Sequence, residues 1–120
     1  MVTDLGKLKE QKFPKYYKET VWNEYSLKLE MSCSIRGNDT KVIQGIYLNE
    51  VTAPDANGVY ADPNDTAKAA ENNRVHADLI QAMSDRTLTI IIKNSKSDKF
   101  PTGCAKTALQ NLEKELWGST

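Results

Sequence analysis

Histidine, cysteine and long apolar runs are all scarce in this sequence. Its one histidine and two well-separated cysteines, Cys33 and Cys104, cannot supply the ligand spacing of a zinc site. The longest strongly apolar stretch is residues 90–92, whereas a membrane-spanning helix needs about 20 apolar residues, so we expect no membrane association. The N-terminus has no apolar signal core, which predicts a cytoplasmic protein with reduced cysteines, a disulfide being the less favoured alternative.

An excess of charge of either sign is also missing. Sixteen basic and sixteen acidic residues give a formal net charge of zero. A domain that binds nucleic acid through its phosphates normally carries a basic excess or a basic stripe, so we expect no direct nucleic-acid binding by the helical domain. Lysines gather loosely before residue 19, where a solvated tail is favoured over an RNA-contacting arm.

Residues that could carry catalysis are equally few. The six glycines are isolated, so there is no phosphate-binding loop. The stretch from Asp55 to Gly58 begins like a calcium-binding loop but loses the alternating register, and no Glu closes it, which favours a solvated loop. His76 lies within an expected helix, where a structural histidine is favoured over a general base. We therefore predict no enzyme activity, no catalytic residue, no metal and no cofactor.

The length of 120 residues suits one domain. Residues 1–18 are interpreted as a polar N-terminal arm and residues 19–118 as a helical domain. Within the arm, Phe13, Tyr16 and Tyr17 are the main apolar side chains. They could fold back to seal one end of the core.

Two segments carry a clear helical pattern. Residues 20–36 and residues 103–117 each place apolar side chains three and four positions apart, which is one face of a helix. Trp22 lies on the first of these faces, so a core position is favoured over an interface anchor. Trp117 lies off the leucine face of the second, and packing within the domain or against a following domain both stay open.

The middle of the chain is more broken. We expect a short helix at 40–44, a helix at 66–83 that Asp65 caps, and a polar loop at 96–103. Residues 46–64 contain Pro54, Gly58 and Pro63, and breakers at that density predict one long loop.

The segment 85–94 gives conflicting signals. Thr87 to Ile92 is rich in β-branched residues and partly alternating, which is typical of a strand. The preceding Ser84-Asp85 pair can cap a helix, and no convincing partner strand exists, so a helix is favoured. The chain is therefore expected to be all-α, a small bundle of four or five helices with one long loop. The predicted core side chains are Trp22, Tyr25, Leu29, Leu79, Ile80, Met83, Leu109, Leu112 and Leu116.

The order of these signals resembles a known family. The quoted segments are Lys12-Phe13-Pro14-Lys15-Tyr16, Val21-Trp22-Asn23-Glu24-Tyr25, Lys41-Val42-Ile43-Gln44-Gly45, Leu79 to Asp85, and Ala105 to Trp117. Together they are similar to the N-terminal capsid domain of Gag proteins from copia-type LTR retrotransposons. The chain departs from that family at Leu109, where the family has Trp, and at Trp117, where it has Tyr.

The resemblance implies a structural protein that self-associates into cytoplasmic virus-like particles. It also implies a homo-oligomeric capsid lattice and a downstream capsid C-terminal domain in the parent chain, with RNA packaging left to segments further downstream. The candidate interface residues are Phe13, Tyr16, Tyr17, Glu24, Lys28 and Trp117. The alternative is a domesticated Gag-like adaptor that binds a partner peptide in a groove between helices, lined by residues 46–48 and by the aromatic residues of the arm.

Overall fold

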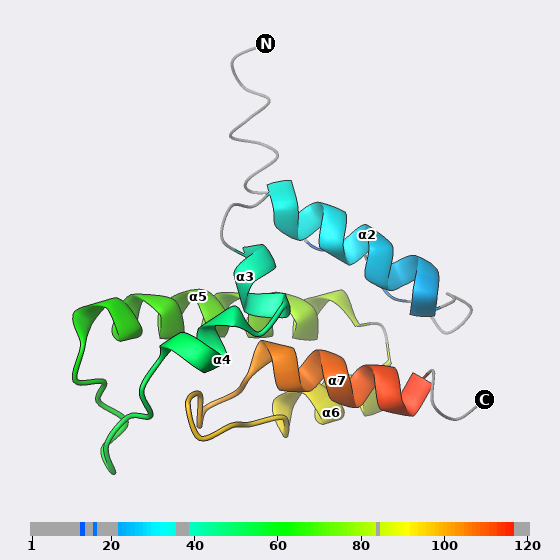
Figure 1. The fold of residues 1–120 in the computed structure, drawn as a ribbon. Coiled ribbons are helices and arrows are strands. Elements are labelled where there is room, and N and C mark those ends of the chain that lie inside the picture. The colour runs from blue at the N-terminus through cyan, green and yellow to red at the C-terminus, as the bar shows by residue number, and fades with distance from the viewer. Residues whose placement is uncertain (1–12, 14–15, 17–21, 36–38, 84, 117–120) are drawn as a thin grey trace.

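The computed structural model describes residues 13, 16, 22–35, 39–83 and 85–116. Within these residues the chain forms α-helices and no strand, so the all-α prediction is confirmed (Figure 1). The helices are α2 (Trp22–Ile35), α3 (Asp39–Ile43), α4 (Ile46–Glu50), α5 (Pro63–Ala82), α6 (Arg86–Lys93) and α7 (Ala105–Leu116). None of the described helices is both long enough and apolar enough to span a membrane.

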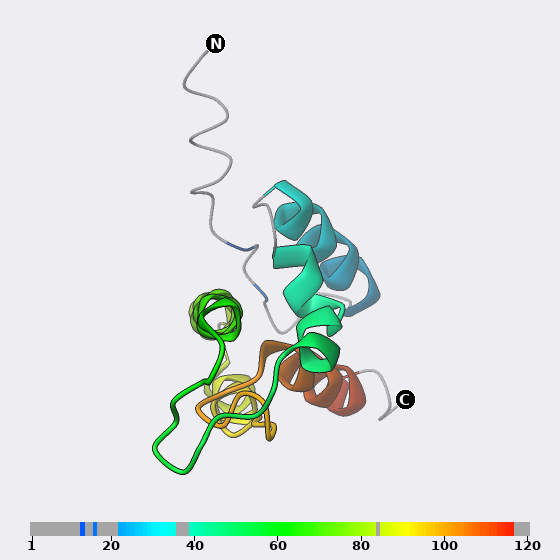
Figure 2. The same cartoon turned by 60° about the vertical axis from the view of Figure 1, so that its left-hand side comes forward.

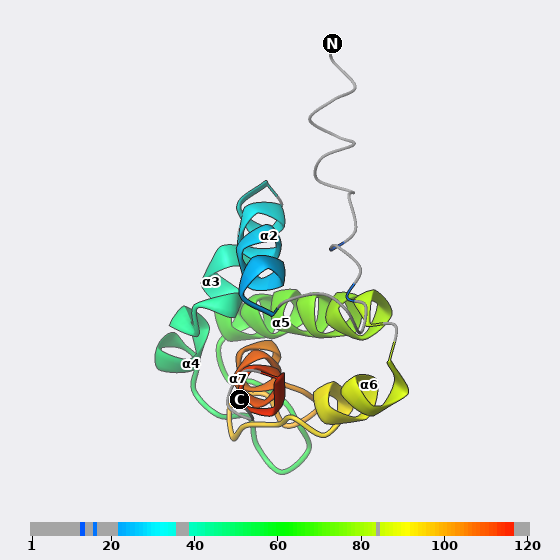
Figure 3. The same ribbon diagram turned by 90° about the vertical axis from the view of Figure 1, so that its right-hand side faces the viewer.

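Helix α5 is the centre of the packing. Its Val75 and Leu79 side chains are completely buried, and α5 contacts α3, α6 and α7. Figure 3 shows α2 and α3 on one side of α5 and the α6–α7 pair on the other. Helices α6 and α7 pack closely on each other, with Ile92 and Leu112 fully buried. One hydrophobic core therefore lies around α5, and it includes most of the predicted core side chains.

The prediction of a continuous loop at 46–64 is wrong at its start, because residues 46–50 form helix α4. Gly45 separates α4 from α3 with φ of 78°, a left-handed conformation that glycine adopts without steric cost. Tyr47 then turns inward and is buried, and its hydroxyl donates to Glu71 of α5 at 2.5 Å. The helix-breaking residues Pro54, Gly58 and Pro63 further along the segment favoured a loop, and a single apolar turn is too short to show a helical pattern.

The start of α5 also differs from the prediction. Asp62, not Asp65, is the N-cap: its carboxylate accepts a hydrogen bond from the Asn64 backbone N–H at 2.8 Å. Pro63 occupies the first helical turn, where its missing N–H costs nothing, so it begins the helix instead of extending the loop. Asp65 is instead buried and accepts from the Thr52 backbone N–H at 3.1 Å, which ties the loop to α5.

The conflict at 85–94 is settled in favour of a helix. The Asp85 carboxylate caps α6 by accepting from the Thr87 backbone N–H at 2.7 Å. Leu88 and Ile92, four residues apart, are buried, while Ile90 between them is 48% exposed. The apolar residues therefore follow the helical period, and the β-branched composition is overridden by the cap and by packing on α7.

Phe13 and Tyr16 lie in the core, each 4% exposed. The Tyr16 ring makes edge-to-face contacts with Trp22 and Tyr25 of α2, with ring centroids 5.9 and 5.1 Å apart. Its backbone N–H donates to the Ala82 carbonyl at the end of α5 at 2.8 Å. These two candidate interface residues therefore stabilise the chain's own core and are not presented to a partner. Tyr17 and Trp117, also proposed as interface residues, fall outside the described part of the chain.

Candidate functional site

Helix α2 carries a second apolar face that the rest of the described chain does not cover. Leu27, Met31 and Ile35 are 57%, 67% and 40% exposed. They are spaced four residues apart and therefore follow one side of the helix. The opposite side carries Tyr25 and Leu29, which are buried in the core. We refer to Leu27, Met31 and Ile35 as the outer stripe.

Two charged residues flank the outer stripe. Glu24 and Lys28, both candidate interface residues, are exposed and lie one helical turn apart. At 100° per residue, Glu24 and Lys28 lie about 60° and 100° around the helix from Leu27, on the side toward which Met31 and Ile35 also turn, with Glu24 about two turns before Met31 and Lys28 about two turns before Ile35. The stripe therefore presents apolar surface with one charge of each sign at its edge.

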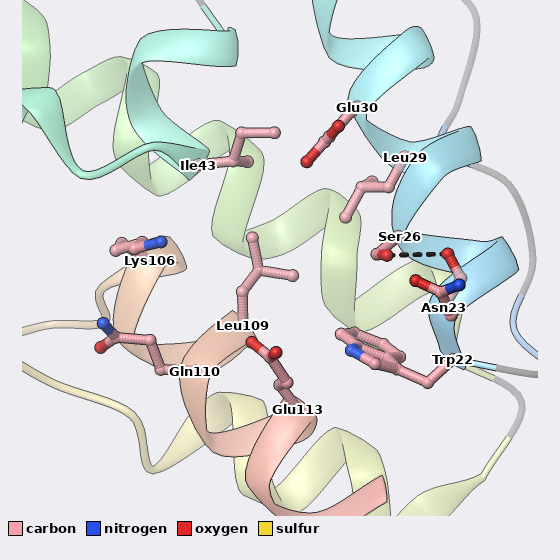
Figure 4. A pocket seen from close by; sticks show the side chains of 10 residues that line it. All are labelled: Trp22, Asn23, Ser26, Leu29, Glu30, Ile43, Lys106, Leu109, Gln110 and Glu113. Atoms are coloured by element: carbon pink, nitrogen blue, oxygen red, sulfur yellow. Dashed lines mark hydrogen bonds between the residues drawn. The ribbon is translucent and has the colours of Figure 1, made fainter. Parts of the chain in front are cut away.

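A groove of about 350 Å³ lies between α2, α3 and α7 (Figure 4). Its apolar floor is formed by Leu29, Ile43 and Leu109, with Trp22 at one end. Its polar rim includes Glu30, Lys106 and Glu113. The groove thus has the usual anatomy of a binding surface, an apolar base with polar edges.

The groove exists because α3 acts as a spacer. Helix α3 packs on α2, α5 and α7, whereas α2 and α7 hardly touch each other. In Figure 2, α3 and α4 descend between α2 and α7. Ile43 at the end of α3 is buried and fills the base of the gap.

One end of the groove is positioned by Gly45. A Cβ atom built there would lie 3.2 Å from Cγ of Lys106, so the aliphatic part of Lys106 lies close against the Gly45 backbone. This packing places the Lys106 ammonium at the rim. Figure 4 shows Lys106 at the start of α7 beside the hollow, and the carboxylates of Glu30 and Glu113 directed toward the hollow from α2 and α7.

The rim charges are unbalanced. Two carboxylates face one ammonium, and within the described residues no ion pair of 4.0 Å or less joins Lys106 to Glu30 or Glu113. A ligand with both an apolar surface and at least one cationic group would therefore match the groove better than a purely apolar one.

Most of the predicted core is buried and the rest is partly buried. Trp22, Tyr25, Leu29, Leu79, Met83 and Leu112 are at most 8% exposed, and Ile80, Leu109 and Leu116 pack against the core from its edge. Three of these residues, Trp22, Leu29 and Leu109, also line the groove. The sequence reasoning missed Val42, Ile43 and Tyr47, which are buried although they belong to very short helices.

His76 has a structural position. It is 9% exposed, and its Nε2 lies 2.8 Å from the Ile92 carbonyl oxygen. Because a carbonyl oxygen only accepts, Nε2 carries the proton and donates it. Cys33 and Cys104 are fully buried and are not joined by a disulfide. Among the described residues, no three His, Cys, Asp or Glu side chains are placed to hold one metal ion.

The groove is not the one expected for the peptide-binding alternative. That alternative placed residues 46–48 and the aromatic residues of the arm around the groove, whereas α2, α3 and α7 supply the lining. Ile46 is on the surface at 37% exposure, and the Tyr47 hydroxyl donates a hydrogen bond to Glu71 of α5. The groove residues Glu30, Lys106 and Glu113 were not anticipated, because nothing in the local sequence of either helix marks them.

Comparison with known proteins identifies no relative. No protein-family model matches the chain, and no curated protein or solved structure matches it significantly. The function proposed below therefore rests on the order of motifs in the sequence and on the geometry of the described residues.

Proposed function

We propose that this chain is a structural domain that associates with copies of itself, as the N-terminal capsid domain of a copia-type Gag protein does. The observation that carries the proposal is the outer stripe of α2, three apolar side chains on one side of a surface helix. Single exposed apolar residues are ordinary, whereas a contiguous apolar strip with polar edges is typical of a protein–protein contact. The order of motifs along the sequence supports the capsid assignment, and with it a cytoplasmic particle and a downstream capsid domain.

The contact is weak in isolation. Burying a Leu, Ile or Met side chain completely is worth about 1.5–3 kcal/mol. Since the three stripe residues are 40–67% exposed, their burial contributes about 3–4 kcal/mol per copy. The loss of translational and rotational freedom on association offsets much of this. The partner surface that the stripe covers is buried by a similar amount, so about 4 kcal/mol remains after this loss, which corresponds to a dissociation constant near the millimolar range.

Weak contacts suit the assembly of a closed shell. When each copy holds several neighbours, each further contact forms within one assembly and benefits from a high effective concentration. A closed symmetric lattice then becomes stable although any single pair dissociates readily. The net charge of zero limits long-range repulsion between copies.

The proposal is tested by association measurements on the full chain. Sedimentation velocity and backbone NMR shifts are followed from about 10 μM to about 1 mM, a range that reaches the expected dissociation constant. We expect the sedimentation coefficient to rise with concentration and the largest shift changes to include Leu27, Met31 and Ile35. The double variant Leu27→Gln, Met31→Gln should stay monomeric.

The matched control is Ile90→Gln, which removes an apolar side chain of similar exposure, 48%, from α6. This control should associate like the unmodified chain. The proposal fails if the unmodified chain stays monomeric at every concentration and in high salt, or if the double variant associates as well as the control does. A strict monomer that binds a peptide in the groove would instead favour the adaptor alternative.

A further inference from the structure

We propose that Asn57 is a site of spontaneous covalent modification, the deamidation of its side chain, and that Asp55 sets the rate of this reaction. Asn57 precedes Gly58 in the loop between α4 and α5, and both residues are exposed. Figure 1 shows this loop projecting away from the helices. The inference concerns a part of the surface separate from the outer stripe and does not depend on self-association.

The reacting atoms are the backbone nitrogen of Gly58 and the side-chain carbonyl carbon, Cγ, of Asn57. Asparagine is a thermolabile residue because the nitrogen that follows it can attack this carbon and close a succinimide ring. A side chain on the following residue hinders that approach, and Gly58 has none. No heavy atom lies within 4 Å of the place where a Cβ atom of Gly58 would be, so the loop has room for the ring to form.

The reaction needs no reactant other than water. A bond forms between the Gly58 nitrogen and Cγ of Asn57, and the bond from Cγ to the side-chain amide nitrogen breaks, so that ammonia leaves with the proton that Gly58 gives up. Water then cleaves one of the two ring C–N bonds. Cleavage at Cγ gives aspartate, whereas cleavage at the backbone carbonyl gives isoaspartate, in which the main chain passes through the side chain. Both products carry a carboxylate in place of the amide.

A tight turn restrains the attacking nitrogen. The Gly58 N–H donates to the Asp55 carbonyl at 2.9 Å, and the Asp55 N–H donates to the Val59 carbonyl at 3.0 Å. Gly58 has φ of 79°, the left-handed conformation that commonly ends a three-residue loop of this kind. The nitrogen can attack only after its own hydrogen bond breaks. The reaction therefore proceeds through the fraction of molecules in which the turn is locally open.

The Asp55 carboxylate stabilises the closed turn. Its Oδ1 accepts hydrogen bonds from the backbone N–H groups of Asn57 at 2.8 Å and of Val59 at 3.0 Å, the residues on either side of Gly58. Aspartate often begins a turn because its side chain can bond the backbone in this way. Its negative charge also disfavours the anionic nitrogen that carries out the attack. Both effects slow the deamidation of Asn57.

The modification alters the tip of the loop and leaves its ends in place. Isoaspartate lengthens the main chain within the turn and adds a second carboxylate near Asp55, so the hydrogen bonds of the turn are lost. The ends of the loop are held elsewhere, because the Thr52 N–H donates to Asp65 and the Tyr60 hydroxyl donates to the Lys99 carbonyl. Each copy, whose formal net charge is zero, gains one negative charge.

The experiment incubates the full chain at neutral and at mildly alkaline pH and follows every asparagine by peptide mapping with mass spectrometry. Electron-transfer fragmentation separates isoaspartate from aspartate. Asn57 should be the first asparagine to react, and it should react faster at the higher pH because the attacking nitrogen must lose a proton. Asn94 is the internal comparison, since it also precedes a small residue. The Ser95 N–H donates to the Ile92 carbonyl and Ser95 is buried, so Asn94 should react far more slowly.

The role of Asp55 is tested by substitution. Asp55→Ala should raise the rate at Asn57 about tenfold, toward the rate of the unmodified chain in urea, because it removes two hydrogen bonds that hold the turn closed. Asp55→Asn keeps an acceptor oxygen without the charge and should raise the rate less. The matched control is Asp98→Ala, which removes an exposed carboxylate that lines the same shallow hollow as Asp55 but lies outside the turn. This control should leave the rate unchanged.

Two results overturn the inference. One is a folded chain in which Asn57 keeps its amide over the time in which the same residue loses it in urea. The other is an Asp55→Ala variant that deamidates no faster than the unmodified chain, with circular dichroism showing that the variant is folded. Neither result concerns the outer stripe, so the proposed self-association is tested separately.

Discussion

Replacing Gly103 with alanine should destabilise the fold strongly. Gly103 precedes α7 with φ of 148°, a conformation that residues with a side chain rarely adopt. A Cβ atom built there would lie 2.6, 2.8 and 2.9 Å from Cε1, Nε2 and Nδ1 of His76. The imidazole is held in place because its Nε2 donates to the Ile92 carbonyl at 2.8 Å. The added methyl group therefore meets a ring that moves only by giving up a buried hydrogen bond.

The magnitude follows from two contributions. Overpacking of a filled interior costs about 1–3 kcal/mol. Holding alanine at an unfavourable φ costs a further 1–3 kcal/mol or so. The sum, about 2–6 kcal/mol, is a large fraction of the 5–15 kcal/mol or so by which small domains are stable. For a domain of about 100 residues it corresponds to a fall in Tm of at least about 8 °C.

Gly58→Ala is the matched control. Gly58 also has a positive φ of 79°, but no heavy atom lies within 4 Å of the position of an added Cβ. This variant therefore reports the backbone contribution without the clash. Urea unfolding of both variants should show Gly103→Ala to be about 1–3 kcal/mol more destabilising than Gly58→Ala.

A double-mutant cycle with His76→Ala isolates the clash further. His76→Ala alone loses the bond to Ile92 and leaves a cavity, at a cost of about 2–3 kcal/mol. In that background, Gly103→Ala should cost only the backbone contribution, which gives a coupling energy of about 1–3 kcal/mol between the two positions. Equal costs for Gly103→Ala in the presence and absence of the imidazole would refute this reasoning.

Three further outcomes are expected. Asn72→Asp keeps the acceptor for the Ala105 backbone N–H, 2.9 Å away, but loses the donor to the Gly103 carbonyl, 2.7 Å away. Chemical denaturation at neutral pH should show that the free energy of unfolding falls by about 2–3 kcal/mol. A fall below about 0.5 kcal/mol would contradict the assigned hydrogen bonds. Arg74→Met removes the guanidinium that donates two hydrogen bonds to the fully buried Asp39, and it should lower the free energy of unfolding by about 2–3 kcal/mol. Arg74→Lys should restore only part of that stability. An unchanged denaturation midpoint would argue against this ion pair. Burial raises the pKa of Tyr25 above its ordinary value of 10.0, and burial together with the Glu71 hydrogen bond raises that of Tyr47, so the unfolded state ionises first and stability should be constant below about pH 10 and fall above it. Tyrosinate absorbance that developed at pH 10 for all tyrosines with no loss of helical signal would refute that explanation.

The long helices were accessible from the sequence because each shows its own apolar period. Leu79 in α5 and Leu112 in α7 are fully buried, as their spacing predicts. Helix α6 was decided by the capping residue Asp85, which outweighed its β-branched composition. Helix α4 was missed because one apolar turn carries too few residues to show a period, and it is held by the long-range contact of Tyr47 with Glu71.

The candidate site was accessible only in part. Glu24 and Lys28, which were predicted as interface residues, lie at the edge of the outer stripe, but the exposed Leu27 and Met31 were not predicted, because the core stripe on the opposite side already accounted for the helix. The groove could not be predicted at all. It depends on how far α3 separates α2 from α7, and that distance is set by tertiary packing of residues distant in the sequence.

The two apolar sides of α2 have separable roles. Tyr25 and Leu29 bind the helix to the core, whereas Leu27 and Met31 remain 57% and 67% exposed. Leu, Met and Gln have similar helix propensities, so exchanging the exposed pair for Gln changes the local helix preference little and removes no core contact. Nothing in the stability of the isolated chain therefore requires these two side chains to be apolar. Their contribution becomes favourable only when another surface covers them, which is why association, and not Tm, is the property that their replacement should change.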